Sequence, residues 1–172
     1  MFSQSVLIGD HPQAPEQFAR WLTCNDVVLT ATKCHRSLTG NIATDDDELV
    51  EWLARNLINH HYSDFRLQQL REKFGQLGFP RYAEQNRKFP RADKTKKGNA
   101  TEVLLVEYVS KSLRKDLLKV FKLKYNPNVD QAIKGDDTLM VDLINVDGVD
   151  KIKVYLGESK FRSTPSKAVV DE

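Results

Sequence analysis

One turn signal constrains the fold of this 172-residue chain more than any other feature. Asp147-Gly148 separates two runs rich in β-branched and aliphatic residues, 138–146 and 151–158. The dipeptide Asp-Gly favours a two-residue hairpin turn, because both central positions of that turn need a positive φ. The sequence therefore predicts an antiparallel β-hairpin between residues 138 and 158.

The same turn sets which residues of the hairpin face one another. A two-residue turn gives the apolar cross-strand pairs Leu139 with Leu156, Val141 with Val154, and Leu143 with Ile152. Because side chains alternate between faces along a strand, all six lie on one face. We expect this apolar face to be the covered face of the hairpin.

Three charged residues lie at the open end of that face. The two-residue turn places Asp137 opposite Glu158, and Lys160 shares the face of Glu158. A four-residue loop would place Asp137 opposite Lys160 instead, still on this face. Neighbouring carboxylates repel and are costly to bury, so they share a proton, pair with a cation or hold a metal. The alternative interpretation is a set of solvated charges at a frayed strand end.

The residue types at this end suit metal-assisted hydrolysis. Carboxylate oxygens are the ligands that Mg²⁺ prefers, and Mn²⁺ accepts the same donors. Asp137 and Glu158 therefore offer the donors that a Mg²⁺ or Mn²⁺ ion uses. Lys160 is expected to orient the attacking water or to stabilise developing negative charge.

An amphipathic helix is expected before the hairpin, with Asn99 as its N-cap. Its apolar stripe comprises Val106, Val109, Leu113, Leu117 and Val120, and its exposed face comprises Lys111, Arg114, Lys115, Lys119 and Lys122. A short strand is expected at residues 121–125. Glu102 would point to the acidic end of the hairpin if this helix covers the apolar face. The alternative is a capping box between Asn99 and Glu102.

The first part of the chain predicts mainly helices. A strand is expected at residues 27–32, followed by a helix with Thr44 as N-cap and by a second helix over residues 64–74. The first helix has the apolar stripe Leu49, Trp52, Leu53, Leu57 and Ile58. Residues 79–98 lose periodicity and predict a loop, so we place a mainly helical region at 1–90 and a second domain at 91–172.

The net charge of +2 conceals an uneven distribution. Residues 87–124 carry a net charge of +8, between two segments of −3 each. The basic stretch can bind phosphates of a nucleic acid or form a solvated loop. It comprises Arg87, Lys88, Arg91, Lys94, Lys96 and Lys97. Two cysteines suit a reducing cytoplasm, and no apolar run is long enough to predict a membrane span.

Three blocks of this sequence carry a family resemblance: residues 97–102, 135–137 and 157–161, which include Glu102, Asp137, Glu158 and Lys160. They resemble the HamA family, the nuclease subunit of the bacterial Hachiman anti-phage system, within the PD-(D/E)xK nuclease superfamily. The resemblance implies an α+β protein with a helical N-terminal region and a restriction-endonuclease-like αβββα core. It also implies a metal at Asp137 and Glu158, water activation by Lys160, and Glu102 as the acid of the helix.

The resemblance further implies a DNA substrate and a helicase partner. This chain has no GxxxxGK[ST] phosphate loop, so an ATP-driven step requires another protein. The superfamily core needs a further helix and strand after the Glu158 strand, so the core is expected to be C-terminally truncated here. The alternatives are a non-catalytic nucleic-acid-binding or helicase-regulating module and an unrelated α+β interaction domain.

Overall fold

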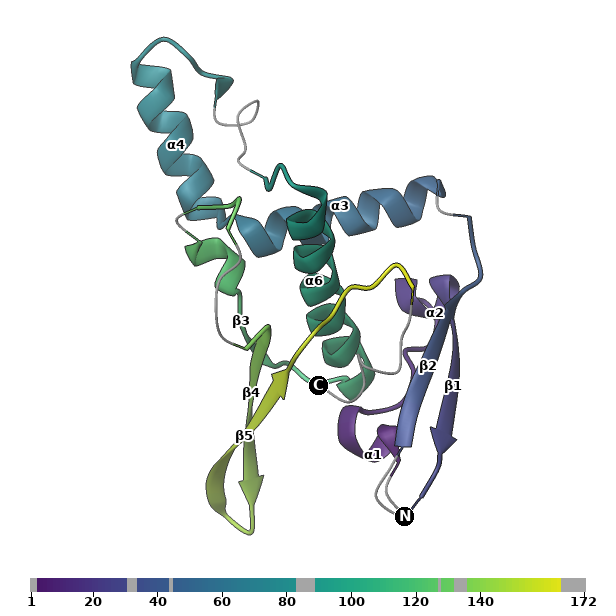
Figure 1. The fold of residues 1–172 in the computed structure, drawn as a ribbon. Helices are drawn as coiled ribbons and strands as arrows, with labels where there is room; N and C mark the ends of the chain where they lie inside the picture. The colour runs from purple at the N-terminus through teal and green to yellow at the C-terminus, as the bar shows by residue number, and fades with distance from the viewer. Residues whose placement is uncertain are drawn as a thin grey trace. The chain divides into compact units, whose positions relative to one another are not determined.

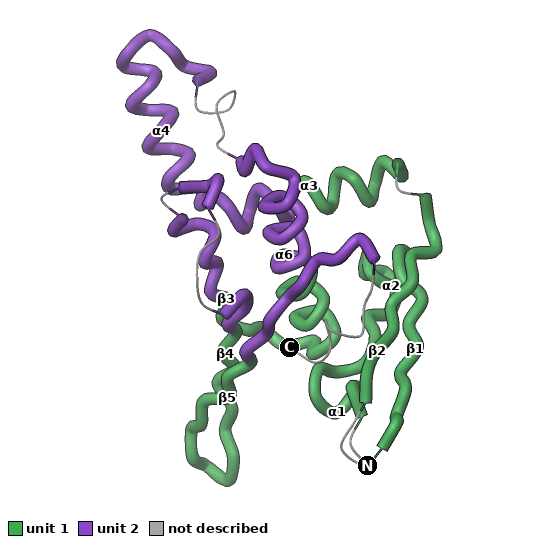
Figure 2. Tube along the Cα trace, in the orientation of Figure 1, with its two compact units in different colours: residues 1–55, 104–119, 140–155 green, residues 56–103, 120–139, 156–172 purple. Residues whose placement is uncertain are grey.

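The computed structural model describes residues 3–30, 34–43, 45–82, 89–126, 128–131 and 136–164. These residues form a mixed α+β structure with a two-stranded sheet, β1-β2, and a three-stranded sheet in the order β3-β4-β5 (Figure 1). The chain divides into two compact units (Figure 2). Unit 1 comprises residues 1–55, 104–119 and 140–155, and unit 2 comprises residues 56–103, 120–139 and 156–172. The division at residue 90 stays a prediction.

Unit 1 begins with two short helices and a β-hairpin. These are α1 (Gln4–Ile8), α2 (Gln17–Trp21), β1 (Leu22–Val28) and β2 (Cys34–Gly40). The strands pair antiparallel, with Leu22 opposite Gly40 and Val28 opposite Cys34. The predicted strand at 27–32 was therefore misplaced, since β1 starts at Leu22 and ends at Val28. Residues 31 and 32 lie outside the described residues.

Both N-terminal helices that the sequence predicted are confirmed, as α3 (Asp47–His61) and α4 (Asp64–Gln76). The Asp46 carboxylate accepts the backbone N–H of Leu49 at 2.9 Å, which satisfies one of the free donors at the start of α3. Ser63 caps α4 in the same way by accepting the backbone N–H of Arg66. The predicted cap Thr44 lies outside the described residues.

Helix α6 (Asp93–Leu113) begins earlier than the sequence predicted. Asp93 lies in its first turn, where a negative charge favours the helix dipole. The prediction of a loop through residue 98 is therefore wrong for residues 93–98. Asn99 is no N-cap but a buried residue inside the helix, and its side-chain amide bonds the ring of His61 at 3.1 Å. The capping-box interpretation of Glu102 is excluded with it.

The helix also ends earlier than its apolar stripe suggested. Arg114 has a φ of 52°, the left-handed conformation that commonly ends a helix. Strand β3 (Leu118–Val120) and the 3₁₀-helix η1 (Lys122–Tyr125) follow. The predicted strand at 121–125 is thus wrong, because these residues form a helical turn that buries Leu123 and leaves Tyr125 exposed.

The C-terminal hairpin is confirmed as β4 (Thr138–Val146) and β5 (Val149–Gly157). Asp147 and Gly148 have φ values of 55° and 79°, as the two-residue turn requires. The strands begin and end at positions that fit the predicted register. Asp137 immediately precedes β4, and Glu158 immediately follows β5.

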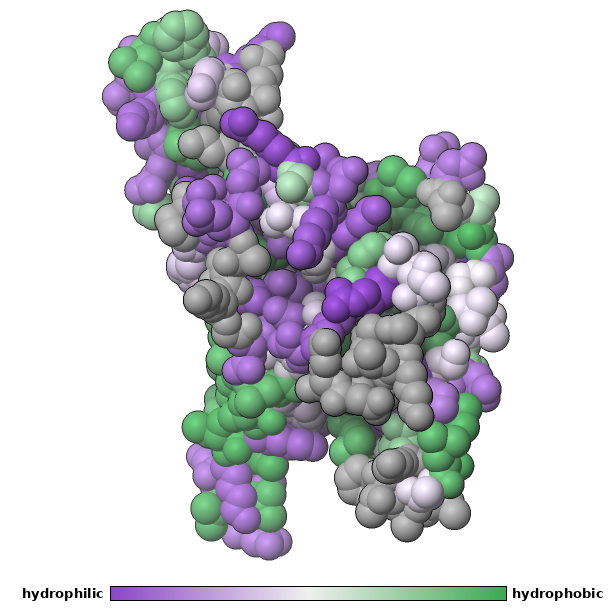
Figure 3. Space-filling view, in the orientation of Figure 1, coloured by the Kyte–Doolittle hydropathy of each residue, from purple (hydrophilic) through white to green (hydrophobic). Residues whose placement is uncertain are grey.

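The covered face of the hairpin is the opposite of the one predicted. Met140 is 2% exposed and packs with Val106, Val109 and Leu117 in the core of unit 1. Leu143 and Ile152, on the other face, are 70% and 68% exposed. Figure 3 shows apolar surface over this hairpin at the lower left.

The buried face also carries a charged residue, Asp142, which is 7% exposed. Its carboxylate pairs with the ammonium of Lys115 at 2.5 Å. A buried charge is tolerated when it is paired.

No helix among the described residues is long and apolar enough to cross a membrane.

Candidate functional site

Four segments of unit 2 bring together a small cluster of charged and polar residues. Glu102 lies on α6, Lys122 begins η1, Asp137 precedes β4, and Ser159 follows β5. Two of these elements are the predicted helix and hairpin. The cluster therefore joins residues that are up to 57 positions apart in the sequence, and we call it the Lys122 cluster.

The ammonium of Lys122 lies against two carboxylates. Its Nζ is 2.8 Å from Oδ1 of Asp137 and 3.2 Å from Oε2 of Glu102. Ser159 holds the other oxygen of Asp137, because its backbone N–H and its hydroxyl donate to Oδ2 at 2.8 and 3.0 Å. The side chains of Lys122, Glu102 and Asp137 are 16%, 16% and 13% exposed.

The two carboxylates share the ammonium unequally. Asp137 makes a hydrogen bond with it, whereas buried Oε2 of Glu102 has no well-aligned hydrogen bond among the described residues, although it lies within ion-pair distance. One positive charge cannot compensate two negative charges fully. Glu102 is therefore the under-compensated partner.

The pKa values of the two acids move apart for this reason. Burial raises the pKa of Glu102 to about 7, because the compensation from Lys122 is weaker than the cost of desolvation. Burial also acts to raise the pKa of Asp137, but the hydrogen bonds from Lys122 and Ser159 outweigh it and leave that pKa lowered. At neutral pH Asp137 is ionised, whereas Glu102 is partly protonated.

The predicted site residues are brought together only in part. Glu102 and Asp137 meet at Lys122, whereas Glu158 and Lys160 lie exposed just after β5. Within the described part of the chain, no three His, Cys, Asp or Glu side chains form a group that could hold a metal ion. The roles assigned to Glu158 and Lys160 stay predictions.

The donor chemistry nevertheless suits a hard divalent cation. Mg²⁺ is usually bound through one or two carboxylates, with waters and substrate phosphate as the other ligands. Asp137 offers an ionised carboxylate, and a cation already lies against it in the form of Lys122. Asp137 therefore offers one donor of the kind that Mg²⁺ or Mn²⁺ binds, and the part of Glu158 as a second ligand stays a prediction.

Sequence reasoning missed Lys122 and Ser159. Lys122 was placed on the exposed face of the helix, but the helix ends at Leu113 and η1 turns this lysine towards the acids. Ser159 has the opposite strand parity to Glu158 and Lys160, which could have indicated a separate role. The Lys122 contact itself had no local signal, because it depends on tertiary packing.

The described part of the predicted basic stretch lies at and before the start of α6. Lys94, Lys96 and Lys97 are exposed on the helix. The ammonium of Lys97 lies 5.3 Å from the ring centroid of Phe161, just after Lys160. The backbone N–H of Arg91 donates to Asp130 at 2.7 Å. Arg87 and Lys88 lie outside the described residues.

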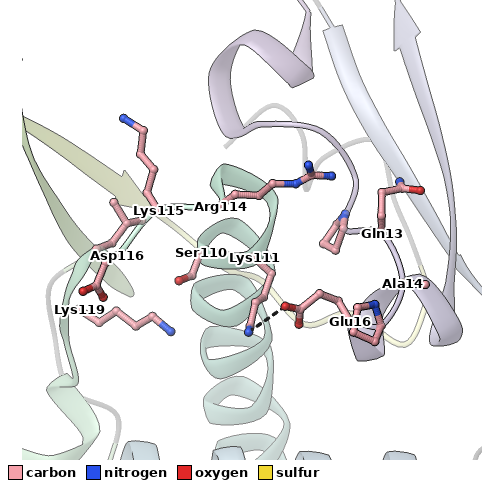
Figure 4. Close-up of a pocket in the computed structure, with 12 residues that line it drawn as sticks. Gln13, Ala14, Glu16, Ser110, Lys111, Arg114, Lys115, Asp116 and Lys119 are labelled. Atoms are coloured by element: carbon pink, nitrogen blue, oxygen red, sulfur yellow. Dashed lines mark hydrogen bonds and ion pairs between the residues drawn. The ribbon is translucent and has the colours of Figure 1, made fainter.

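Unit 1 has a separate cleft of about 530 Å³ beside the end of α6 (Figure 4). Its wall carries Lys111, Arg114, Lys115 and Lys119. The sequence predicted these residues on one exposed helix face, which is wrong because α6 ends at Leu113 and only Lys111 lies on it. The three lysines pair with the carboxylates of Glu16, Asp142 and Glu107, respectively. Internal ion pairs thus compensate most of the positive charge of this cleft.

Fold and site together define an α+β protein with a buried, lysine-bridged pair of acids near the open end of a β-hairpin. The chain belongs to the HamA family, whose sequence model matches residues 16–172. It is 41% identical over 175 residues to a relative from Bacillus cereus described as "Hachiman protein HamA". That alignment covers 100% of this chain but 60% of the relative. No solved structure matches the chain.

Proposed function

We propose that this chain is a metal-dependent nuclease subunit that hydrolyses DNA phosphodiester bonds in bacterial anti-phage defence. Membership of the HamA family and the Hachiman description of the Bacillus cereus relative support the defence role. The observation that carries the chemistry is the contact of Asp137 with Lys122 and Ser159 at the end of the hairpin. It places an ionised, oriented carboxylate beside the Glu158-Ser159-Lys160 segment.

In this proposal each residue has one task. Asp137 and Glu158 would hold Mg²⁺ or Mn²⁺, and such an ion would supply polarisation of a phosphoryl oxygen and a lower pKa for a bound water. Ser159 fixes Asp137 by two hydrogen bonds. Glu102, whose pKa is about 7, can accept or give a proton near neutral pH. Lys160 orients the water or stabilises negative charge.

The order of elements supports a PD-(D/E)xK-like core. Helix α6 is followed by β3, β4 and β5 in one sheet, which agrees with the αβββ part of that core. Exposed Lys94, Lys96 and Lys97 at the start of α6 would contact backbone phosphates, in a manner independent of sequence. Arg87, Lys88 and Arg91 are proposed for the same task.

We propose a helicase as the partner and the cytoplasm as the location. These 172 residues contain no GxxxxGK[ST] phosphate loop, which is consistent with an ATP-driven step supplied by a helicase. A non-specific nuclease also needs restraint, and a partner that delivers the DNA would supply it.

The test is cleavage of DNA by single variants of the protein in the presence of Mg²⁺. Glu158→Ala and Lys160→Ala should each abolish cleavage while the circular dichroism spectrum stays unchanged. Lys151→Ala is the matched control, because this exposed lysine lies on β5, seven positions before Glu158. Undiminished cleavage in both site variants would refute the nuclease proposal.

A second candidate function is a non-catalytic module that binds nucleic acid or regulates the helicase. It is favoured by the absence of a three-residue metal-binding group among the residues that the structure describes. Calorimetry distinguishes the two functions. Binding of Mg²⁺ or Mn²⁺ that is lost in Asp137→Asn supports the nuclease, whereas no binding supports the module.

A further inference from the structure

Lys122 is held in place by the turn that carries it. Leu123, the next residue, is buried. The carbonyl of Lys124 accepts a hydrogen bond from Arg66 at 3.2 Å, and the ammonium of Lys124 lies 4.2 Å from the ring centroid of Phe121. The residues that precede and follow Lys122 are thus held by these contacts. The position of Lys122 follows from the fold rather than from a chance rotamer at the surface.

The contact with Lys122 uses one of the two oxygens of Asp137. Oδ1 takes the ammonium at 2.8 Å, while Oδ2 is held by Ser159. An ammonium is a compact donor with three N–H groups, and it needs the same lone pairs that a metal ion needs. The flexible four-carbon stem of lysine allows the head group to move while the backbone of η1 stays fixed.

We propose that Lys122 is the resting counter-ion of the site, and that its ammonium must leave Oδ1 of Asp137 before a divalent cation binds there. This inference rests on the proposed function, because it takes Asp137 as a metal ligand. In the resting protein the ammonium of Lys122 neutralises Asp137 and also lies within ion-pair distance of Glu102. Ser159 holds Oδ2 throughout, so the carboxylate stays oriented when Lys122 moves. Metal affinity is therefore set by competition with an internal cation.

Calorimetric titration with Mn²⁺ in the absence of DNA tests the competition. Lys122→Met keeps the length of the side chain but removes its charge, and should bind Mn²⁺ about tenfold more tightly or better. Lys124→Met is the matched control, because it removes the same charge two residues away on the same turn without touching either acid. An equal gain in both variants, or no binding by Lys122→Met, would overturn the inference.

Lys122→Arg provides the opposite arm and serves if Lys122→Met does not fold. A guanidinium keeps the charge and can bind a carboxylate through two hydrogen bonds, so it should compete better and weaken Mn²⁺ binding several-fold. Affinity equal to that of the unaltered protein would refute the competition.

The outcomes separate this inference from the proposed function. DNA cleavage that depends on Glu158, combined with unchanged metal affinity in the Lys122 variants, would refute the inference alone. Metal affinity that follows the expected order, combined with no cleavage by the unaltered protein, would refute the nuclease alone.

Discussion

The two units each contain a buried basic side chain, and the two side chains are used differently. In unit 1, Arg36 bonds Asp26, its direct cross-strand partner, through both carboxylate oxygens at 2.6 Å. The same guanidinium donates to the carbonyl of Gly9 and the hydroxyl of Tyr108. One positive charge meets one negative charge. In unit 2, Lys122 meets two negative charges.

The pKa values follow this difference. The hydrogen bonds between Arg36 and Asp26 raise the pKa of Arg36 and lower that of Asp26, so both stay ionised. The under-compensated Glu102 instead has a pKa of about 7. An ion pair with balanced charges keeps both groups ionised, whereas an unbalanced cluster keeps a group that titrates near neutral pH. The contrast is one reason to propose the Lys122 cluster as the site of chemistry.

The largest expected effect is the loss of the balanced pair. Arg36→Met removes a guanidinium whose side chain is 4% exposed, and with it the hydrogen bonds to the Gly9 carbonyl and to the Asp26 carboxylate, which is 32% exposed. The loss of these charge-assisted hydrogen bonds should lower the free energy of unfolding by about 3 kcal/mol, measured by chemical denaturation at pH 7. Arg55→Met is the control, because its pair with Glu51 is exposed and contributes less than about 0.5 kcal/mol. Equal losses in the two variants would contradict a structural role for Arg36.

A smaller effect, which depends on pH, is expected for Glu102→Gln. In the folded state the pKa of Glu102 is about 7, whereas its ordinary pKa is 4.5. Between these two pH values the folded state therefore binds more protons than the unfolded state. The protein therefore loses stability as the pH rises from about 4.5 to about 7. The shift corresponds to ~3 kcal/mol, and partial contact with solvent reduces the expected effect to about 2 kcal/mol.

Urea denaturation at several pH values measures this effect. Glu102→Gln cannot ionise, so it should be about 2 kcal/mol more stable than the unaltered protein at pH 8 and nearly equal to it at pH 4. Glu48→Gln, an exposed acid on α3, should show no such trend. A parallel pH dependence of Glu102→Gln and the unaltered protein would refute the imbalance at Lys122.

The sequence predicted those parts of the fold that have a local cause. The hairpin followed from Asp147-Gly148, because a turn of this kind depends on two residues. Helices α3 and α4 followed from periodicity and from the acidic residues at their starts. The start of α6 was missed, because Asn99 resembles an N-cap in the local sequence, whereas in the folded protein its side chain bonds His61, 38 positions away.

The errors at the site have the same origin. Both faces of the hairpin contain apolar residues. The apparently less apolar face is buried through the packing of Met140, and Lys115 compensates the charge of Asp142 there. Glu102 and Asp137 were predicted as neighbours, and they do meet at one ammonium. Lys122 could not be found in advance, because an isolated lysine has no pattern. Tertiary contacts decide which of many lysines reaches an acid.

The smallest effect is expected where one hydrogen bond is removed from the unbalanced cluster. Ser159→Ala loses the hydroxyl bond to Oδ2 of Asp137 but keeps the backbone N–H bond. The loss of one charge-assisted hydrogen bond should cost about 1 kcal/mol at pH 7 and raise the pKa of Asp137 towards 3.8. A carboxylate with a lowered pKa stabilises the fold above its ordinary pKa, and this contribution disappears as the pH falls through the native pKa. The difference in free energy of unfolding between Ser159→Ala and the unaltered protein should therefore shrink below about pH 4.

NMR titration of the Asp137 carboxyl measures the shift of its pKa, with exposed Ser37→Ala as the control. An unchanged Asp137 pKa in Ser159→Ala would mean that Lys122 alone holds this acid, and the contrast between the two units would then rest on the ammonium by itself.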